Sequence, residues 1–262
     1  MEKLKRLFLA SIIAFLFFLF LFLSSQSASA GSFKADQRKF PRVKEAYKLK
    51  EDVLKKLFEE KGLHYPPKQI FFRVFKVERK FEVWVIGKEK KFVLLKEYGV
   101  PPRINSFIGP KRRKSDLLVP EGFYKIVVFN HNSKFYLSLG INYPNELDKL
   151  VGDKDNPGED IFIHGGRASL GCIPLTNDGI QEVYLLAVEA QNAGQKSISI
   201  HIFPARLLMK KDGLETVIPE FDPALIEFWK NLREGYNFFE TNKILPQIQV
   251  KSKRYMFQKP KS

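Results

Sequence analysis

Short apolar runs with the two-residue period of β-strands recur between residues 70 and 141. In residues 80–87, Phe81, Val83 and Val85 fall on alternate positions, and the short charged spacers on either side suit hairpin loops. The pattern predicts strands over residues 70–75, 80–87, 91–98, 123–130 and 134–141, a short buried strand over 161–164 and a further strand within 196–205.

Helical spacing of apolar residues occurs in three places. Residues 45–62 place Leu54 and Leu57 on one helical face, and residues 176–194 repeat apolar positions at the same spacing; both stretches end at glycine. The C-terminal part of the chain predicts one or two helices around residues 223–240 and a terminal pair of strands. We therefore expect a mainly β chain with peripheral helices, an α+β fold.

The N-terminal segment differs from the rest of the chain. A basic start precedes a long apolar run and then Ala28-Ser29-Ala30, which has the small-residue pattern of a signal-peptide cleavage site. We interpret residues 1–30 as a signal peptide. The alternative is an uncleaved membrane anchor, because the apolar run is nearly as long as the roughly 20 residues of a spanning helix. Either way the sequence predicts an exported protein of the periplasm or cell envelope, in contact with a membrane only if this segment stays attached.

The chain is strongly basic, with a formal net charge of +15 over 262 residues. Because export keeps a protein away from nucleic acid, we expect no nucleic-acid partner and favour an anionic envelope surface, although a solvated basic surface explains the charge nearly as well. The chain has one cysteine, and its four histidines, His64, His131, His164 and His201, lack metal-ligand spacing. We expect neither a metal site nor a cofactor.

The only cysteine, Cys172, lies in the stretch HGGRASLGCIPL, residues 164–175, and cannot form an intramolecular disulfide. A thiol becomes a nucleophile when a base or a positive charge favours the thiolate, and a glycine-rich loop can bring His164 within reach of it. A buried structural thiol beside a core histidine is the alternative. The combination of histidine, glycines and a single cysteine in an exported chain favours catalysis, with His164 lowering the thiol pKa and the Gly171 backbone near the oxyanion.

A long polar segment, residues 142–160, directly precedes the strand that ends at His164. Such a length inside a compact domain is typical of a functional loop, so we expect a lid over the bound substrate. A disordered surface loop is the alternative, because the stretch GDKDNPGED has the composition of disorder.

The stretch 164–175 resembles the active-site signature of the L,D-transpeptidases with a YkuD-type catalytic domain, in which a histidine and a glycine precede a Ser/Thr-x-Gly-Cys element. Residues 109–126, GPKRRKSDLLVPEGFYKI, are similar to the family's approach to the site. The stretches LSLGINYPNELDK, GCIPLTNDGIQEVY, SIHIFP and FWKNLREGYNFFE resemble the YafK-like branch in particular. The likeness covers most of residues 68–258.

The resemblance implies a mechanism and a set of site residues. Cys172 would attack a stem-peptide carbonyl at a diamino acid and form a thioester, and His164 would act as general base and acid. Gly171 would contribute its backbone to oxyanion binding, with Ser169 in support. Substrate contacts are expected from Arg167, Gly165, Gly166, Lys111, Tyr124 and Tyr143. The acyl group would then pass to an amine or to water.

Two positions depart from the pattern of many family members. Leu170 stands where a second histidine often precedes the Gly-Cys pair, which leaves His164 as the only nearby base. Pro174 stands where an arginine often meets a substrate carboxylate, and Arg167 or Lys111 is the candidate replacement. The second departure leaves the direction of the reaction open.

The resemblance also implies how the chain is organised. A β-sandwich or barrel-like catalytic domain is expected over residues 68–206, with a helical N-terminal extension over 31–67 and a C-terminal extension over 207–262 packed on it. We expect a peptidoglycan-modifying L,D-transpeptidase whose partners are stem peptides. The alternative is an amide hydrolase on the same scaffold, which would release a wall-attached lipoprotein or peptide. A non-catalytic wall-binding module is the third possibility, and the intact histidine and cysteine argue against it.

Overall fold

The computed structural model describes residues 32–101, 108–167, 169–210 and 222–260. The chain divides into two units, residues 1–32 and 33–262, and the helices and strands described belong to the second. The predicted signal peptide or anchor, residues 1–30, lies outside the described residues. No helix within the described ranges is both long enough and apolar enough to cross a membrane.

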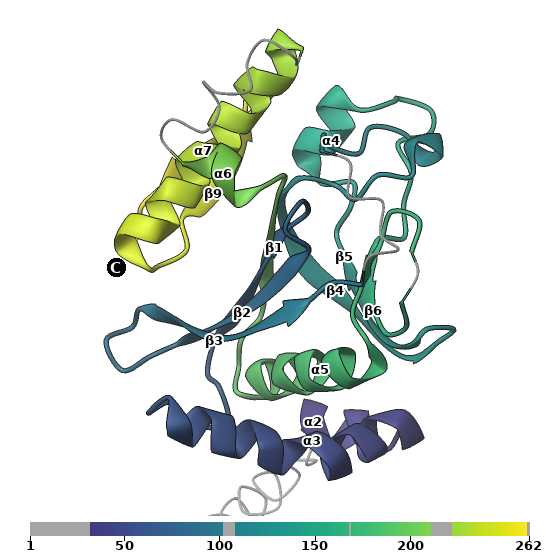
Figure 1. The fold of residues 1–262 in the computed structure, drawn as a ribbon, viewed down its shortest axis with the longest axis vertical. Coiled ribbons are helices and arrows are strands. Elements are labelled where there is room, and N and C mark those ends of the chain that lie inside the picture. The colour runs from purple at the N-terminus through teal and green to yellow at the C-terminus, as the bar shows by residue number, and fades with distance from the viewer. Residues whose placement is uncertain (1–31, 102–107, 168, 211–221, 261–262) are drawn as a thin grey trace, which may run out of the picture. The chain divides into compact units, whose positions relative to one another are not determined.

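Eight strands form one mixed sheet in the order β3-β2-β1-β8-β4-β5-β6-β7 (Figure 1). Their bounds are β1 Ile70–Phe75, β2 Lys80–Ile86, β3 Phe92–Gly99, β4 Gly122–Ser133, β5 Tyr136–Ile141, β6 Phe162–His164, β7 Ile173–Pro174 and β8 Ser199–Phe203. Neighbouring strands run antiparallel, except for the pairs β1–β8 and β6–β7, which are parallel.

Strand β4 joins the two halves of this sheet. Its first residues, 122–125, pair with β8, and the residues from Ile126 onward pair with β5. The register shifts between Ile126 and Val128, where the partner changes, and an irregularity of this kind bends a strand. The half that contains β5, β6 and β7 carries the predicted nucleophile and base.

Helix α5 (Asn177–Asn192) packs against β1, β5 and β6 of the sheet and is covered in turn by α2 (Phe33–Gln37) and α3 (Pro41–Glu60), as Figure 1 shows. Because it lies between the sheet and other helices, α5 is buried almost all round. Its buried glutamates are compensated, since Glu182 accepts from the Tyr98 hydroxyl at 2.7 Å and Glu189 accepts from the Tyr47 hydroxyl at 2.9 Å. Helix α3 therefore belongs to the same core as the sheet.

The other face of β1 and β2 is covered by helix α7 (Pro223–Asn242). Phe239 of α7 packs on Phe71 and Trp84, with ring centroids 4.7 Å and 5.0 Å apart. Strand β1 is thus buried on both faces, which explains why its residues form a nearly continuous apolar run. Helix α6 (Arg206–Met209) and the hairpin of β9 (Gln247–Lys251) and β10 (Arg254–Gln258) pack beside α7.

The predicted α+β fold, a mainly β sheet with peripheral helices, is confirmed, and each predicted strand and long helix is present at or close to its expected bounds. Five short elements were missed: α2, α6, β7, a 3₁₀ turn at Lys114–Asp116 and α4 (Glu146–Val151). Helix α4 lies within residues 142–160 and buries Leu147 and Asp148, so this part of the segment is packed and not a disordered loop. The lid function stays a prediction. The predicted domain boundaries at residues 68 and 207 also stay predictions. In the structure, residues 33–262 form a single compact unit.

Candidate active site

Strands β6 and β7 place Cys172 beside His164. The two strands pair in parallel, with His164 opposite Pro174. In this register Cys172, which directly precedes β7, falls beside Phe162, two positions from His164 along the strand. The pairing thus brings the expected nucleophile and the expected base to nearby positions of one strand pair, and their joint action stays a prediction.

The glycines of the motif let the chain turn back so that β7 can run parallel to β6. A Cβ atom at Gly165 would lie 2.6 Å from the Phe135 carbonyl oxygen and 2.7 Å from Asn177 Oδ1, which is closer than side chains approach. Gly166 has a φ of +82°, which favours glycine, and its N–H donates to Asn177 Oδ1 at 2.9 Å. Both glycines are needed by the turn, and their contact with substrate stays a prediction.

The Cys172 thiol is half-buried and has two backbone neighbours. Its Sγ accepts a hydrogen bond from the Phe162 N–H at 3.4 Å, and the thiol donates to the Asp160 carbonyl oxygen at 3.5 Å. Burial raises the pKa of the Cys172 thiol above its ordinary value, while hydrogen bonds from the Phe162 N–H and the Ser169 hydroxyl oppose the rise. At neutral pH the thiol is therefore protonated.

The His164 imidazole is buried, with a residue exposure of 2%. Its Nδ1 lies 2.6 Å from the Gly165 carbonyl oxygen. A carbonyl oxygen can only accept, so Nδ1 carries the proton and Nε2 remains unprotonated in the neutral ring. Burial lowers the pKa of His164, and the hydrogen bond to Gly165 opposes this. The Phe135 ring covers the imidazole, with centroids 4.5 Å apart. Nε2 is thus available as a base at neutral pH.

These pKa directions correct one expectation. The sequence predicted that His164 would lower the thiol pKa, but among the described contacts His164 and Cys172 share no hydrogen bond. Burial instead raises the pKa of the thiol and lowers that of the imidazole, because it disfavours the charged form of each. Both groups are therefore neutral at neutral pH, and the nucleophilic role of Cys172 stays a prediction.

Ser169 and Gly171 lie close to Cys172 in the chain. Ser169 Oγ accepts the Cys172 N–H at 2.8 Å, so an oxyanion would have to take the place of this hydroxyl. Gly171 has a φ of +95°, and a Cβ atom there would lie 3.2 Å from the Leu118 carbonyl oxygen. The oxyanion role of Gly171 and the supporting role of Ser169 stay predictions.

Burial raises the pKa of the Cys172 thiol, and the charge of Lys111 opposes that rise. The Lys111 ammonium donates to Asp116 Oδ1 and to the Arg113 carbonyl oxygen, both at 2.8 Å. The Asp116 carboxylate also accepts the N–H groups of Arg112, Arg113 and Leu118. The Asp116 carboxylate neutralises the Lys111 charge, so the Lys111 side chain stabilises the loop. A contact between Lys111 and a substrate carboxylate stays a prediction.

The remaining predicted substrate residues lie in different surroundings. Tyr124 and Tyr143 are buried. The Tyr124 hydroxyl donates to the Glu121 carbonyl oxygen at 3.2 Å, and the Tyr143 hydroxyl donates to the Pro157 carbonyl oxygen at 2.8 Å. Arg167 is exposed on the loop between His164 and Cys172. Both tyrosine hydroxyls thus donate to backbone carbonyl groups, and the substrate contacts of all three residues stay predictions.

Sequence reasoning missed three residues that shape the site. Phe135, 53% exposed, reaches His164 only because β5 pairs with β6, so no local signal marks it. Asn177 holds Gly166 and directly follows the cysteine motif at the start of α5. Glu121 is a charged residue in an otherwise apolar turn, and this contrast in the sequence could have marked it as a residue with a structural role. Among the described residues, no group of three or more histidine, cysteine, aspartate or glutamate side chains is arranged to hold a metal ion.

The YkuD L,D-transpeptidase catalytic domain model matches residues 77–201, a range that contains both His164 and Cys172. The protein named "Putative L,D-transpeptidase YafK" from Escherichia coli K12 is 31% identical over 198 residues, which cover 74% of this chain and 75% of that protein. The chain belongs to the L,D-transpeptidase family with a YkuD-type catalytic domain. A protein of the same name from Escherichia coli O157:H7 matches this chain with the same values. The family expected from the motif is confirmed.

Two solved structures are also similar to this chain. The helical cell shape determining protein Pgp2 from Campylobacter jejuni is 18% identical, with a TM-score of 0.42 over 72% of this chain and 74% of that chain. Bd1075 from Bdellovibrio bacteriovorus is 16% identical, with a TM-score of 0.38 over 74% of this chain and 87% of that chain. At these values nothing about activity or substrate follows from the two structures.

Proposed function

We propose that this L,D-transpeptidase is an active cysteine enzyme that acts on peptidoglycan stem peptides in the periplasm or cell envelope. One observation carries the proposal: in the register of β6 with β7, a half-buried thiol falls two positions from a buried imidazole whose Nδ1 lies 2.6 Å from a carbonyl oxygen. The match to the catalytic domain supports the reaction class. The signal-like segment 1–30 supports export, and the net charge of +15 suits an anionic wall.

In the first half-reaction, Cys172 Sγ attacks the carbonyl carbon of a diamino acid in the stem peptide. As the S–C bond forms, the thiol proton passes to Nε2 of His164 and the carbonyl oxygen becomes an oxyanion. The Cys172 N–H, released by Ser169, and the backbone at Gly171 stabilise the oxyanion. When the C–N bond breaks, the leaving amine takes the proton from His164. A thioester on Cys172 remains.

In the second half-reaction, the amine of another stem peptide attacks the thioester carbonyl. His164 accepts a proton from this amine as the new C–N bond forms. The S–C bond then breaks, and His164 returns the proton to the departing sulfur. The product is a cross-link and the free enzyme is regenerated.

Hydrolysis is the second candidate, and Pro174 favours it. This residue is buried in β7 opposite His164, and it brings no charge to the position where many family members carry an arginine. With water as the acceptor, the same thioester yields a free carboxylate on the stem. The enzyme would then release a peptide or lipoprotein that had been attached to the wall through an amide.

Mass spectrometry of reaction products tests both steps. Purified protein is incubated with tetrapeptide wall fragments and, separately, with lipoprotein-bearing wall. Cross-linked dimers identify a transferase, and released peptide without dimers identifies a hydrolase. Either result requires an acyl adduct on the intact protein, which Cys172→Ala should not form. Normal turnover by Cys172→Ala, or no adduct and no product from either substrate, would contradict the proposal.

A further inference from the structure

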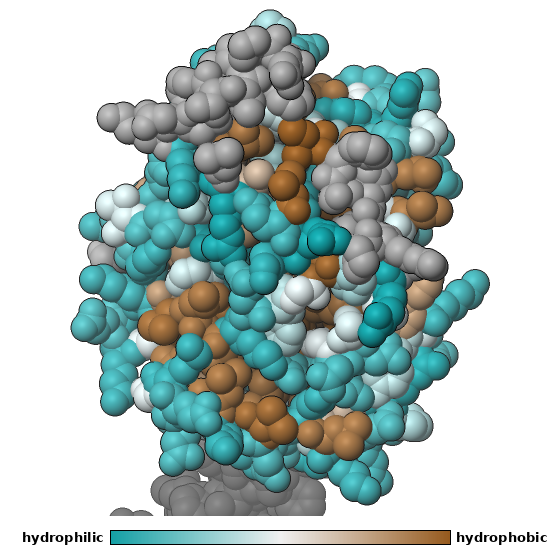
Figure 2. All heavy atoms as spheres, in the orientation of Figure 1, coloured by the Kyte–Doolittle hydropathy of each residue, from teal (hydrophilic) through white to brown (hydrophobic). Residues whose placement is uncertain are grey.

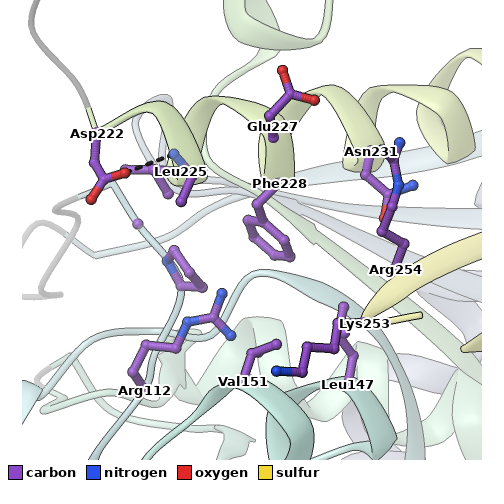
Figure 3. Close-up of a pocket in the computed structure, with 13 residues that line it drawn as sticks. Arg112, Leu147, Val151, Asp222, Leu225, Glu227, Phe228, Asn231, Lys253 and Arg254 are labelled. Atoms are coloured by element: carbon purple, nitrogen blue, oxygen red, sulfur yellow. Dashed lines mark hydrogen bonds between the residues drawn. The ribbon is translucent and has the colours of Figure 1, made fainter. Parts of the chain in front are cut away.

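A cleft of about 660 Å³ lies beside loop residues 109–112, between α4 and the C-terminal elements α7 and β9–β10 (Figure 3). Its volume is in the range of pockets that hold small ligands. The lining residues that matter here are Arg112, Leu147, Val151, Phe228, Lys253 and Arg254. Figure 3 shows the Arg112 and Lys253 side chains extending from opposite sides toward the space around Phe228.

Arg112 brings an unsatisfied donor to this cleft. Its Nη1 is buried and makes no hydrogen bond among the described residues, and its guanidinium carbon lies 5.2 Å from the centre of the Phe228 ring. Burial raises the pKa of Asp148 to about 6, and the charge of Arg112 opposes this rise. The Asp148 carboxylate accepts from the Asn145 N–H, and no hydrogen bond joins it to Arg112 among the described residues. A buried guanidinium donor without an acceptor costs free energy, which an anionic ligand would recover.

Lys253 reaches the cleft from an unusual backbone position. It forms, with Ser252, the two-residue turn of the β9–β10 hairpin, and the φ angles of Ser252 and Lys253 are 51° and 57°. Turns of this shape favour glycine or asparagine at both positions. A lysine in the left-handed region costs conformational energy, and residues in such conformations cluster at functional sites. The positive charge of Lys253 is therefore a candidate for ligand binding.

The acidic residues along the cleft are already engaged. Asp222 accepts the Ala224 N–H at 2.7 Å and so caps α7, while Glu227 pairs with Lys230 at 2.7 Å. Arg254 pairs with Glu234 at 2.9 Å. Among the described residues of the cleft, this leaves Arg112 and Lys253 as the cations without an ion pair.

The cleft borders the same loop as the active site. Burial raises the pKa of the Cys172 thiol and the charge of Lys111 opposes that rise, while the next residue, Arg112, lies over Phe228 in the cleft. The Leu118 carbonyl oxygen, at the far end of this loop, lies beside Gly171. One loop therefore borders both the cationic cleft, through residues 109–112, and Gly171, the neighbour of Cys172.

We propose that this cleft is a subsite that binds a free carboxylate of the wall peptide whose amide reacts at Cys172. The inference rests on the proposed function and adds the place where the substrate is recognised. The planar guanidinium of Arg112 matches a carboxylate, and Lys253 adds a second positive charge. The apolar side chains of Leu147, Val151 and Phe228 suit the aliphatic part of a peptide. This combination favours a peptide carboxylate over a sugar, which offers hydroxyl groups without charge.

Titration calorimetry with Cys172→Ala protein measures binding without turnover. The probes are a disaccharide tetrapeptide with free carboxylates, the same fragment fully amidated, and two fragments amidated only at the terminal or only at the side-chain carboxylate. We expect the acid to bind at least about tenfold more tightly than the full amide, since charge-assisted hydrogen bonds are the strong ones. Arg112→Gln should remove this difference, and Arg112→Lys should keep part of it. The two singly amidated fragments show which carboxylate enters the cleft.

Two further variants keep the test independent of folding. Lys253→Gly suits the backbone angle of the turn and should weaken binding of the acid about threefold through the loss of one charge. Arg113→Gln removes the same charge as Arg112→Gln from a neighbouring exposed residue that does not line the cleft, and it should bind like the parent. If Arg112→Gln and Lys253→Gly also bind like the parent, the proposal is overturned.

Turnover assays separate this inference from the proposed function. If the enzyme turns over wall fragments and Arg112→Gln has an unchanged KM for acid and amide, the subsite is wrong and the proposed function stands. If wall fragments bind with the expected dependence on Arg112 but never form an acyl-enzyme, the proposed function is wrong and the subsite stands.

Discussion

Two regions lie next to Cys172, and they differ in the charge of their buried side chains. At the β6–β7 strands, the thiol and the imidazole are both neutral, because burial moves each pKa away from the charged form. In the loop region 109–121, buried charges are paired instead. Lys111 pairs with Asp116 at 2.8 Å, and Lys76 pairs with Glu121 at 3.0 Å, with both side chains of the second pair fully buried.

Glu121 shows how far the pairing in the loop region extends. Besides Lys76, it accepts the Gly109 N–H at 2.7 Å and the indole N–H of Trp229 at 2.8 Å. Lys76 in turn donates to the Gly109 and Val119 carbonyl oxygens. A buried ion pair with these hydrogen bonds made resists displacement. The difference between the regions separates support from the proposed chemistry. The charged loop holds its surroundings in place, and the neutral thiol and imidazole are the groups that we propose exchange a proton.

The largest expected effect comes from removing the neutral pair. Cys172→Ala and His164→Ala should each lower kcat/KM roughly ten-thousand-fold or more, because the groups of a catalytic unit act together. Product formation measured by mass spectrometry checks this. The thermal unfolding midpoint should stay close to that of the parent, which separates lost chemistry from lost structure. Near-parental turnover in either variant would remove that residue from the mechanism.

Breaking the charged support should instead cost stability. Lys76→Met leaves the Glu121 carboxylate buried without its counter-charge, and we expect the free energy of unfolding to fall by about 3–5 kcal/mol. Denaturant titration measures the loss. The matched control is Lys80→Met, which breaks the exposed pair of Lys80 with Glu97 and should cost about 1 kcal/mol or less. Equal losses in both variants would mean that the buried pair gives no special support.

The pH dependence tests whether the reacting pair is neutral. His164 has to be unprotonated to accept the thiol proton, so kcat/KM should rise with pH up to the His164 pKa, which burial places below its ordinary 6.5. Activity should then stay level until the thiol begins to ionise above 9.0. Iodoacetamide should accordingly modify Cys172 slowly at pH 7 and faster as the pH approaches that value. Fast modification at pH 7 would instead show a thiolate–imidazolium pair.

A smaller effect is expected from the ring that covers His164. Phe135→Ala should admit water to the imidazole, weaken the effect of burial and raise the His164 pKa toward 6.5. The acid limb of the kcat/KM profile should therefore move to higher pH, with only a few-fold change at pH 8. Val127→Ala on the same hairpin removes another exposed apolar side chain and should leave the profile unchanged. An unchanged profile in Phe135→Ala would show that groups other than Phe135 exclude water from the imidazole.

Sequence reasoning succeeded where the signal was local. Strand β1 has its predicted bounds because its apolar run is bounded by polar and turn-forming residues. Helix α4 was missed because six residues are too few for a helical period to stand out. Its stability comes from Asn145, whose side chain accepts the Asp148 N–H at 3.0 Å, and from Leu147, which packs in the cluster of Trp229 and Tyr255. The last of these contacts depends on residues far along the chain.

The sequence by itself determined the periods of the main strands and helices and singled out Cys172 and His164, because these signals lie within short stretches. Backbone geometry sets the side-chain period of each element, so it can be read locally. Only the tertiary structure decided the charge state of the two residues, since burial depends on what packs around them. It also decided the cationic cleft, whose Arg112, Phe228 and Lys253 come from distant parts of the chain. Contacts between elements follow from sheet order and packing, which no local pattern contains.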